Sequence, residues 1–162
     1  MELKLPLSVI SQVDVARLLR ELNSLDDFFV GAKVRQGGTP IQPPRLTRRL
    51  EQLAAANNVN LLDEKQRQDL QPKLDAVLAK APRLHISFAT EPAPAALDKI
   101  LDWLRQNIHP QCLLQVGLQP TIAAGCVLRT PNKVFDMSLR SFLKQQEPYL
   151  VKLIAGAAGE SR

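Results

Sequence analysis

The stretch from Gln119 to Leu143 constrains the fold more than any other part of the chain, because a turn signal separates two strand-like runs there. Residues 126–130 mix apolar and polar side chains in alternation, which is typical of a strand covered mainly on one face. Residues 130–133, TPNK, place proline at the second position of a turn, where a type I turn favours it. Residues 134–136 resume an extended pattern, so the two runs are predicted to pair as a β-hairpin.

A helix is expected directly after this hairpin. Asp136 and Ser138 offer side-chain oxygens that can accept hydrogen bonds from the free amides of a helix N-terminus. Leu139, Phe142 and Leu143 then recur at helical spacing. We therefore expect this helix to be held down by one apolar face.

The first strong helical signal begins near the N-terminus. Ser11 is a good N-cap residue, and Asp14 follows it in the acidic first turn. Apolar residues then recur at spacings of three and four and draw one stripe along the helix. Such a stripe most often packs in a core, and the same pattern also suits a helix that contacts a partner. The stripe consists of Val15, Leu18, Leu22, Leu25 and Phe29.

Helix continuity stays open at two positions in the first half of the chain. Asn23 and Ser24 lie inside the first helical pattern, although both residue types favour caps over helix interiors. Pro72 lies inside a third helical pattern, which Asp63 caps. That helix therefore either kinks at the proline or starts afresh at Leu70.

A second helix is predicted over residues 45–57, and its first turn is crowded with arginine. Arg45, Arg48 and Arg49 would place positive charge at a helix N-terminus, which is unfavourable by roughly a few tenths of a kcal/mol. This cluster either belongs to a solvated polar face or is kept for an acidic partner. Between the first two helices, residues 35–44 are rich in glycine and proline, which predicts a connector without regular structure.

The hydrophobic period changes from helical to alternating after Pro82. Residues 84–89 alternate between apolar and mainly polar side chains, which predicts a strand. A helix is predicted over residues 95–107, and the apolar residues within 113–116 predict a further strand.

Together these elements predict an α+β protein with two domains. Residues 1–82 are expected to form a helical domain, and residues 83–162 a small domain with the order strand, helix, strand, strand, helix. A mixed sheet with helices laid on one face is the economical arrangement of these elements. With 162 residues, the chain is long enough to bury a substantial core.

The net charge of +5 favours an acidic partner of some kind. The basic residues are dispersed, and five Phe, one Tyr and one Trp are too few for an obvious base-stacking platform, which argues against nucleic acid. A small basic RNA-binding module nevertheless remains the alternative, because mixed sheets of this kind do bind RNA. It would need aromatic side chains on an open sheet face, for which Phe88 and Phe135 are the strand candidates.

No arrangement of residues points to catalysis. His85 falls on the polar side of a predicted strand and His109 at a helix end, and both are better explained structurally. Cys112 and Cys126 lie far apart in apolar surroundings, so neither a disulfide framework nor a metal site is predicted. We therefore expect a non-catalytic protein that holds no cofactor or metal.

Two features bear on location. No apolar run reaches the roughly 18 to 20 residues that a membrane crossing needs. The N-terminal residues lack the small-residue cleavage site of a secretory signal. These features predict a cytoplasmic protein.

The hairpin stretch also resembles a known signature. Its pattern, G-x-V-x-R-x-x-x-K-V-x-D-x-S-x-R-x-x-L, is similar to the C-terminal signature of the ATP synthase delta subunit family, which includes the oligomycin-sensitivity-conferring protein. That family usually begins this region with Asp-Pro-small-Leu-Ile-Gly-Gly, whereas residues 119–125 here are QPTIAAG. The resemblance covers about the second half of the chain, and the helical half is shorter than in the family. The matching residues are Gly125, Val127, Arg129, Lys133, Val134, Asp136, Ser138, Arg140 and Leu143.

The resemblance implies a stator function in an F-type ATP synthase. In this family the C-terminal domain faces the b subunits of the peripheral stalk, and the N-terminal domain binds the N-terminal segments of the alpha subunits. Such a subunit resists the torque of the rotor and lies on the inner face of the plasma membrane through its complex. The resemblance also implies structural roles, with Gly125 in a kink and Asp136 and Ser138 in a cap. Arg129 and Arg140 are expected to be exposed.

Overall fold

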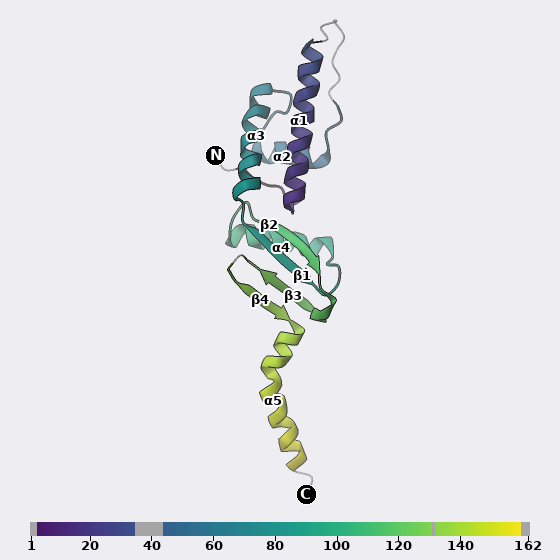
Figure 1. The fold of residues 1–162 in the computed structure, drawn as a ribbon, viewed down its shortest axis with the longest axis vertical. Coiled ribbons are helices and arrows are strands. Elements are labelled where there is room, and N and C mark those ends of the chain that lie inside the picture. The colour runs from purple at the N-terminus through teal and green to yellow at the C-terminus, as the bar shows by residue number, and fades with distance from the viewer. Residues whose placement is uncertain (1–2, 35–43, 131, 160–162) are drawn as a thin grey trace. The chain divides into compact units, whose positions relative to one another are not determined.

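The computed structural model describes residues 3–34, 44–130 and 132–159. Within these residues the chain forms five α-helices, one short 3₁₀ helix and a four-stranded mixed sheet (Figure 1). Three α-helices come first, and a region of strands and helices follows, which confirms the predicted α+β class.

The chain divides into two compact units. The helical unit consists of the residues up to Arg83 together with Ala95–Leu114. The hairpin unit consists of Leu84–Pro94 and the residues from Gln115 onward. The first division falls beside the predicted domain boundary, but residues 95–114 group with the helices and not with the second domain, to which they were assigned from the sequence.

The helical unit is built on α1 (Gln12–Val34), α2 (Arg48–Asn57) and α3 (Glu64–Lys80), and α4 (Pro94–Asn107) belongs to it from Ala95 onward. α1 and α3 run side by side (Figure 1). Full burial of a leucine side chain stabilises a fold by roughly 1.5–3 kcal/mol, so the shared leucine core is the main support of this unit. That core includes Leu18, Leu22, Leu50, Leu53, Leu70 and Leu74.

α1 begins with the predicted reciprocal cap. The amide of Ser11 donates to the Asp14 carboxylate at 3.0 Å, and the amide of Asp14 donates to Ser11 Oγ at 3.3 Å. Arg49 Nη1 donates to the other carboxylate oxygen of Asp14 at 2.7 Å. Burial alone would raise the pKa of Asp14, but the hydrogen bonds from Ser11 and the charge of Arg49 outweigh it and lower the pKa below its ordinary value.

α1 is one continuous helix, so Asn23 and Ser24 do not divide it. Ser24 Oγ donates to the carbonyl of Arg20 one turn earlier at 2.9 Å, which satisfies the hydroxyl inside the helix. Asn23 Oδ1 accepts a hydrogen bond at 2.6 Å from Gln71 Nε2 on α3. Two residues that favour caps are therefore tolerated because each has a partner.

α2 starts later than the sequence predicts. The side chain of Thr47 caps the helix by accepting a hydrogen bond from the amide three residues on, so the helix begins at Arg48. Arg45 consequently lies before the helix and not within it. Of the remaining two arginines, Arg49 is paired with α1, so the predicted positive cluster is divided among three different surroundings.

α3 begins at the predicted cap. The Asp63 carboxylate accepts a hydrogen bond from the amide of Lys65 at 3.0 Å. Pro72 lies inside the helix, which runs unbroken over Glu64–Lys80. A fresh start at Leu70 is therefore excluded. The proline removes one amide donor from the ladder, and tertiary packing compensates for that loss.

A buried cation joins α3 to α1. Arg67 is 2 % exposed, and its guanidinium binds the carboxylate of Asp26 on α1. Its Nη1 donates to the carbonyl of Leu61 at 2.8 Å, and its charge lies 4.5 Å from the centre of the Phe29 ring. A buried charge is tolerated when such partners replace its hydration.

A half-buried cation, Arg105 on α4, holds the N-terminal segment. Its Nη1 donates to the carbonyls of Leu5 and Pro6, each at 3.0 Å, and its Nη2 donates to the carbonyl of Val9. Its Nε donates to the carbonyl of Cys112 at 3.4 Å. Burial lowers the pKa of Arg105. These bonds explain why residues 95–114 group with the helical unit.

The sheet has the strand order β2-β1-β3-β4. β1 (Arg83–Phe88) pairs antiparallel with β3 (Gly125–Arg129), which pairs antiparallel with β4 (Val134–Ser138) and so forms the predicted hairpin. The sheet is mixed because β2 (Leu113–Leu118) lies parallel to β1, as expected for two strands joined through a helix. A 3₁₀ turn, Pro120–Ile122, leads into β3.

α5 (Leu139–Gly159) follows β4, but the prediction that one apolar face holds it down is wrong. Leu139, Phe142 and Leu143 are 46 %, 58 % and 50 % exposed. The first turn is attached through the amide of Leu139, which donates to the carbonyl of Ala124 at 2.9 Å. The helix then extends away from the strands (Figure 1), so its apolar side chains pass beyond the surface that would have covered them.

The Asp14 cap should make stability depend on acidity. Because the pKa of Asp14 is lowered by folding, its contribution is present above the unfolded value of about 3.9 and is lost as the pH falls through the folded pKa. Asp14→Asn should destabilise the protein by about 1 kcal/mol at neutral pH, and by less at about pH 3. Urea unfolding at both pH values measures this difference. A destabilisation that does not change with pH would contradict the assignment.

The Arg105 contacts should be essential to the helical unit. Arg105→Met keeps much of the side-chain volume but leaves the carbonyls of the N-terminal segment without a donor, so we expect a loss of roughly 2–4 kcal/mol in unfolding free energy. Lys99→Met, an exposed change on the same helix, should cost less than about 0.5 kcal/mol. Equal losses of unfolding free energy for the two substitutions in denaturant titrations would show that the Arg105 contacts do not stabilise the helical unit.

Candidate functional site

The backbone at Gly125 requires glycine. Its φ is 88°, a conformation that residues with a side chain rarely adopt. A Cβ atom at this position would lie 2.4 Å from the carbonyl oxygen of Met137 on the paired strand. Gly125 therefore allows β3 and β4 to approach, in agreement with the expected kink.

A tight turn precedes this glycine. Ala123 has a φ of 67° and a ψ of −57°, and the amide of Ala124 donates to the carbonyl of Ile122 at 2.9 Å. This is a γ-turn of the rarer kind, which is strained when a side chain is present. Small residues before the hairpin therefore keep the strain of this turn low, because a larger side chain would add to it.

Thr130 and Lys133 close the loop between β3 and β4. The amide of Thr130 donates to the carbonyl of Lys133 at 2.8 Å, and the amide of Lys133 donates to Thr130 Oγ1 at 2.9 Å. The predicted turn also depends on Pro131, which lies outside the described residues. The hairpin itself holds the register in which Arg129 is opposite Val134.

Asp136 and Ser138 form the predicted cap of α5. Ser138 Oγ accepts a hydrogen bond from the amide of Ser141 at 3.1 Å, which makes Ser138 the N-cap residue. The Asp136 carboxylate accepts one from the amide of Ser138 at 3.0 Å. Hydrogen bonds from Ser138 lower the pKa of Asp136, with a smaller contribution from the charge of Arg140.

The remaining signature residues differ in exposure. Val127 is buried in the sheet and therefore belongs to the fold. The exposed members include two apolar residues, Val134 at 64 % and Leu143 at 50 %, which a purely structural role does not explain. The exposed members are Arg129, Lys133, Val134, Arg140 and Leu143.

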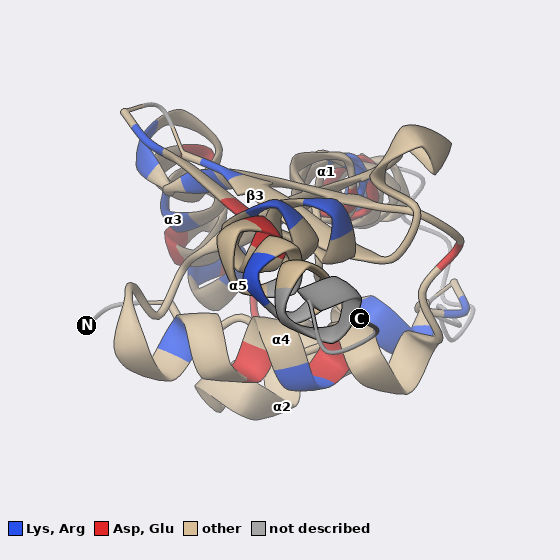
Figure 2. Ribbon diagram, turned by 90° about the horizontal axis from the view of Figure 1, so that it is seen from below, with Lys and Arg blue, Asp and Glu red and all other residues tan. Residues whose placement is uncertain are grey.

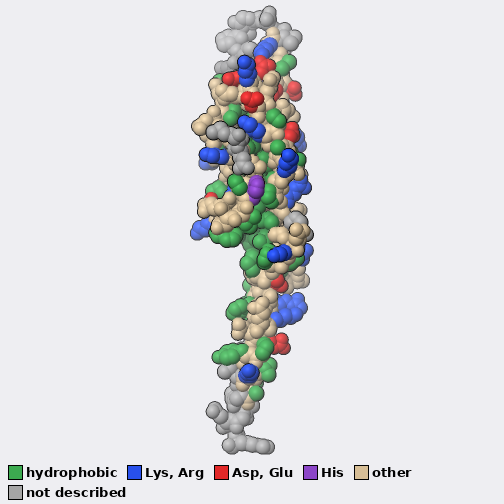
Figure 3. Space-filling view, turned by 90° about the vertical axis from the view of Figure 1, so that its left-hand side faces the viewer, with side chains coloured by type: hydrophobic (Ala, Val, Ile, Leu, Met, Phe, Trp, Pro, Cys, Tyr) green, Lys and Arg blue, Asp and Glu red, His purple; other side chains and the backbone are tan. Residues whose placement is uncertain are grey.

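α5 carries an apolar surface that no described residue of its unit covers. Its hydrophobic side chains are between 46 % and 70 % exposed, and Figure 3 shows them in the lower part of the view. An apolar surface of this extent marks an interaction site more often than a solvated face. This α5 surface comprises Leu139, Phe142, Leu143, Tyr149, Val151 and Ile154.

The apolar stripe of α1 lies in the core of the helical unit. Its first four residues are at most 2 % exposed, and the fifth, Phe29, packs against the same core. The structure therefore agrees with the core interpretation of the pattern, and the stripe is not open to a partner. The four fully buried residues are Val15, Leu18, Leu22 and Leu25.

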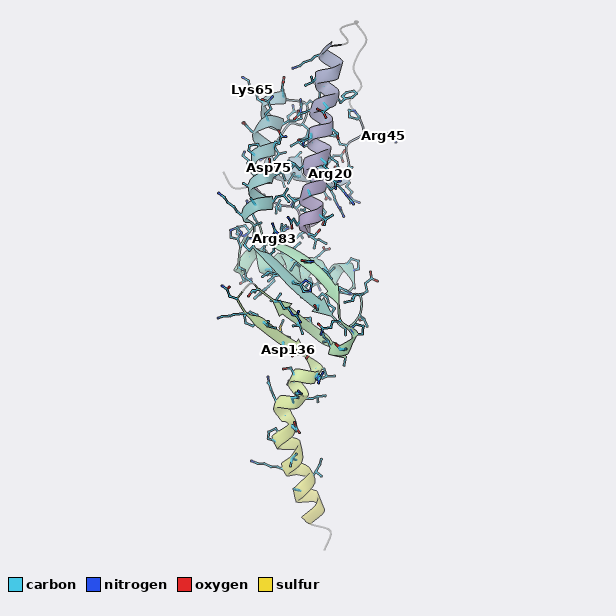
Figure 4. All side chains as sticks on the ribbon, in the orientation of Figure 1. Arg20, Arg45, Lys65, Asp75, Arg83 and Asp136 are labelled. Atoms are coloured by element: carbon cyan, nitrogen blue, oxygen red, sulfur yellow. The ribbon has the colours of Figure 1, made fainter. Side chains whose placement is uncertain are left out.

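A different side of α1 is open. A groove of about 560 Å³ runs between α1 and the segment that leads into α2, and we call it the α1–α2 groove. Arg17, Arg20 and Arg45 lie at its rim, and Phe28 and Leu46 contribute apolar surface. Figure 4 labels Arg20 and Arg45, which lie on the same side of α1.

The part of the chain that the structure describes offers no metal-binding cluster. It contains no cluster of three or more His, Cys, Asp or Glu side chains that could hold a metal ion. Every buried side-chain nitrogen or oxygen in it has a hydrogen-bond partner. None of its helices combines the length and the apolar composition that a membrane crossing requires.

The cysteines and histidines have structural surroundings. Burial raises the pKa of both Cys112 and Cys126, so neither thiol is activated as a nucleophile. His109 Nδ1 accepts a hydrogen bond from the amide of Gln111 at 3.1 Å, which stabilises a turn. His85 packs near Gly117 on the neighbouring strand. These positions agree with the structural interpretation made from the sequence.

The sheet register bears on the RNA-binding alternative. Phe88 lies opposite Cys126, and Phe135 lies opposite Leu128 two residues further along β3, so the two aromatic residues share one face. Arg129 is one residue further and lies on the opposite face. Among the described residues, Figure 2 shows the positions of basic and acidic residues interspersed along the helices. Aromatic and cationic groups of β3 and β4 are therefore separated, which disfavours a stacking platform.

The groove was not predicted as a site. The sequence singled out the arginine cluster at the start of α2, but it assigned Arg17 and Arg20 to no site. Their approach to Arg45 depends on how the chain returns after residues 35–43, and no local pattern encodes that return. The signal that could have found them is the i, i+3 spacing of two arginines beside an apolar stripe.

The hairpin glycine should be irreplaceable, in contrast to a second glycine of the same sheet. Gly125→Ala forces a side chain against the Met137 carbonyl at positive φ, and we expect a loss of at least about 2 kcal/mol. Gly117→Ala meets the flexible His85 side chain at 3.1 Å and should cost about 1 kcal/mol or less. Thermal unfolding of both variants compares them. If Gly117→Ala were the more damaging, the role of Gly125 would be refuted.

Comparison with known proteins adds no relative. No protein-family model matches this chain, and no curated protein sequence matches it. The function is therefore argued from the residues and geometry described above, together with the resemblance carried by the hairpin signature.

Proposed function

We propose that this protein is a stator component of an F-type ATP synthase, where it links the catalytic head to the b subunits of the peripheral stalk. Its action is mechanical, because it holds the head still against the torque of the rotor and transforms no substrate. The starting point is the similarity of residues 125–143 to the delta subunit signature.

The observation that carries the proposal is the use of the signature residues in the hairpin. Gly125 meets a backbone requirement at positive φ, and Ser138 caps the helix that follows. Asp136 supports the cap through the amide of Ser138. The similarity thus extends from the residue types to the local geometry that they serve, which supports a shared fold for this stretch.

A connector must hold two bodies, and each compact unit offers one candidate surface. The α1–α2 groove belongs to the helical unit, and the α5 surface belongs to the hairpin unit. In the proposed assembly the helical unit binds N-terminal segments of the alpha subunits. The α5 surface packs against the b helices, because a helix-to-helix contact buries apolar side chains of the kind that α5 exposes.

The proposed location follows from this assembly. The protein would lie at the inner face of the plasma membrane, on the cytoplasmic side, and be held there by its partners. Washing membranes with a low-salt buffer that releases the catalytic head should release this chain with the head. A chain that stays in the cytosolic fraction of intact cells would contradict the proposed location.

The assignment is tested by isolating the tagged full-length chain from native membranes. We expect alpha, beta and b subunits to be recovered with it, and we expect deletion of the chain to abolish proton-driven ATP synthesis in membrane vesicles. Recovery of ribosomal or other RNA-associated proteins in their place would favour the RNA-binding alternative. Steep salt dependence of binding to generic RNA would do the same.

The α5 surface should be needed for stalk binding but not for folding. Phe142→Asp and Leu143→Asp each remove exposed apolar area that would be buried on binding, so recovery of b subunits should fall at least about ten-fold. Gln145→Asp introduces the same charge at an exposed polar position of α5 and serves as the control. Circular dichroism should be unchanged in all three variants. Equal recovery of b subunits with every variant would exclude α5 as the contact.

A further inference from the structure

The α1–α2 groove has a charge pattern that the proposed function does not explain. Three arginines, Arg17, Arg20 and Arg45, line its rim, and Glu21 is the acidic residue among its lining side chains. Glu21 accepts a hydrogen bond from the neutral hydroxyl of Thr47 at 2.5 Å, so its carboxylate keeps its charge and offsets one of the three arginines. The rim therefore carries an excess of positive charge.

The rim arginines are not neutralised by carboxylates of the described residues. The ion pairs among those residues involve Lys33, Arg49 and Arg67, and none of the three rim arginines. Arg20 Nε donates to the carbonyl of Ala16 within its own helix, which leaves its terminal nitrogens for other acceptors. With one carboxylate among three guanidiniums, the like charges repel one another, and an anionic occupant would relieve that repulsion.

The groove also has an apolar side. Its accessible apolar residues are Phe28, which is 36 % exposed, and the half-buried Leu46. Leu25 also borders the groove but is buried in the core of the helical unit. From Arg17 to Phe28 the groove follows α1 over about 16 Å, or three helical turns. A phosphate ion would use the rim and leave this apolar surface bare. An amphipathic segment of similar length would use both.

We infer that the α1–α2 groove binds an acidic amphipathic segment of another polypeptide. The apolar side chains of that segment pack on Phe28 and Leu46, and its carboxylates pair with Arg17, Arg20 and Arg45. Arginine suits this role because its planar guanidinium binds carboxylates through two parallel hydrogen bonds. The apolar contacts supply affinity, and the charges select the partner by sign.

This inference goes beyond the proposed function, because it names the chemistry of the segment and holds for any complex to which the chain belongs. If the chain selects acidic segments but does not join an ATP synthase, the proposed function is lost and the inference stands. If the chain joins the synthase but its groove does not prefer acidic over basic segments, the proposed function stands and the inference is lost.

The test uses the full-length chain and a displayed library of helical peptides of about 18 residues. Leucine and phenylalanine are fixed at positions i, i+3, i+4 and i+7, and the flanking positions are drawn from acidic, basic and neutral polar residues. After selection on the wild-type chain, we expect a clear excess of Asp and Glu over Lys and Arg. Equal numbers of the two signs among bound peptides would overturn the inference.

Charge reversal locates the effect. Arg17→Glu with Arg20→Glu should invert the selected charge and should weaken a chosen acidic peptide at least about ten-fold. Lys65→Glu with Lys80→Glu makes the same change in net charge on α3. This control should leave the charge preference of the selected peptides and the affinity for the acidic peptide within about two-fold of the wild-type values. Lys65 is labelled in Figure 4. If both double variants act alike, the overall charge of the chain and not the groove selects the peptides, and the inference fails.

Two further measurements separate a peptide groove from a general anion site. Phe28→Gln keeps the rim charges and should weaken the acidic peptide markedly, with helical circular dichroism unchanged. Inorganic phosphate and poly-U RNA should compete no better than the ionic strength they add. Efficient competition by either, or full binding by Phe28→Gln, would assign the groove to simple anions and overturn the inference.

Discussion

A guanidinium bound by backbone carbonyls joins α4 to the N-terminal segment of the helical unit. Arg105 has no carboxylate partner among the described residues, and its donors are divided between the N-terminal segment and the residue just before β2. Lysine could not replace it, because one ammonium cannot reach carbonyls spread over so wide an arc. Burial of this cation is unfavourable in itself, which the lowered pKa reflects. The geometry of α4 and the path of the chain before α1 both depend on these bonds.

Local signals in the sequence predicted local structure well. Ser11 with Asp14, Asp63 and Ser138 cap helices where the sequence places caps, because a cap needs only residues within one turn. The kink at Gly125 was expected from the resemblance to the delta subunit signature. The hairpin register also follows from a turn between two alternating runs. The fold class and most helix boundaries could therefore be predicted without long-range information.

Contacts between distant segments could not be predicted. Arg67 reads as one more polar residue of an exposed helix, and its burial depends on Asp26 and Phe29, some forty residues earlier in the chain. Arg105 is further still from its partners. The rim of the groove needs Arg45 to come beside α1, which is set by the return of the chain and not by any periodic pattern. For α5 the pattern misled, because an apolar helix face predicts a partner surface but does not say that the surface belongs to the same chain.

The groove arginines of α1 and its buried stripe lie on different sides of the helix, and this separation has a simple origin. Residues three and four apart stay on one face, so Leu18, Leu22 and Leu25 turn inward together. Arg17 and Arg20 lie one or two positions away and are carried to another side. A helix can thus stabilise a core and present a charged rim without compromise between the two.

The exposure of α5 has a consequence for the life of the protein in a cell. Pro148 deprives this helix of one internal hydrogen bond, and few contacts hold the helix to its unit, so it should open more readily than the rest of the chain. Proteases cut such segments first. Copies that find no partner would then be degraded, and copies that are covered would survive. Degradation of unbound copies would thus keep the amount of this protein equal to the number of binding sites on its partners.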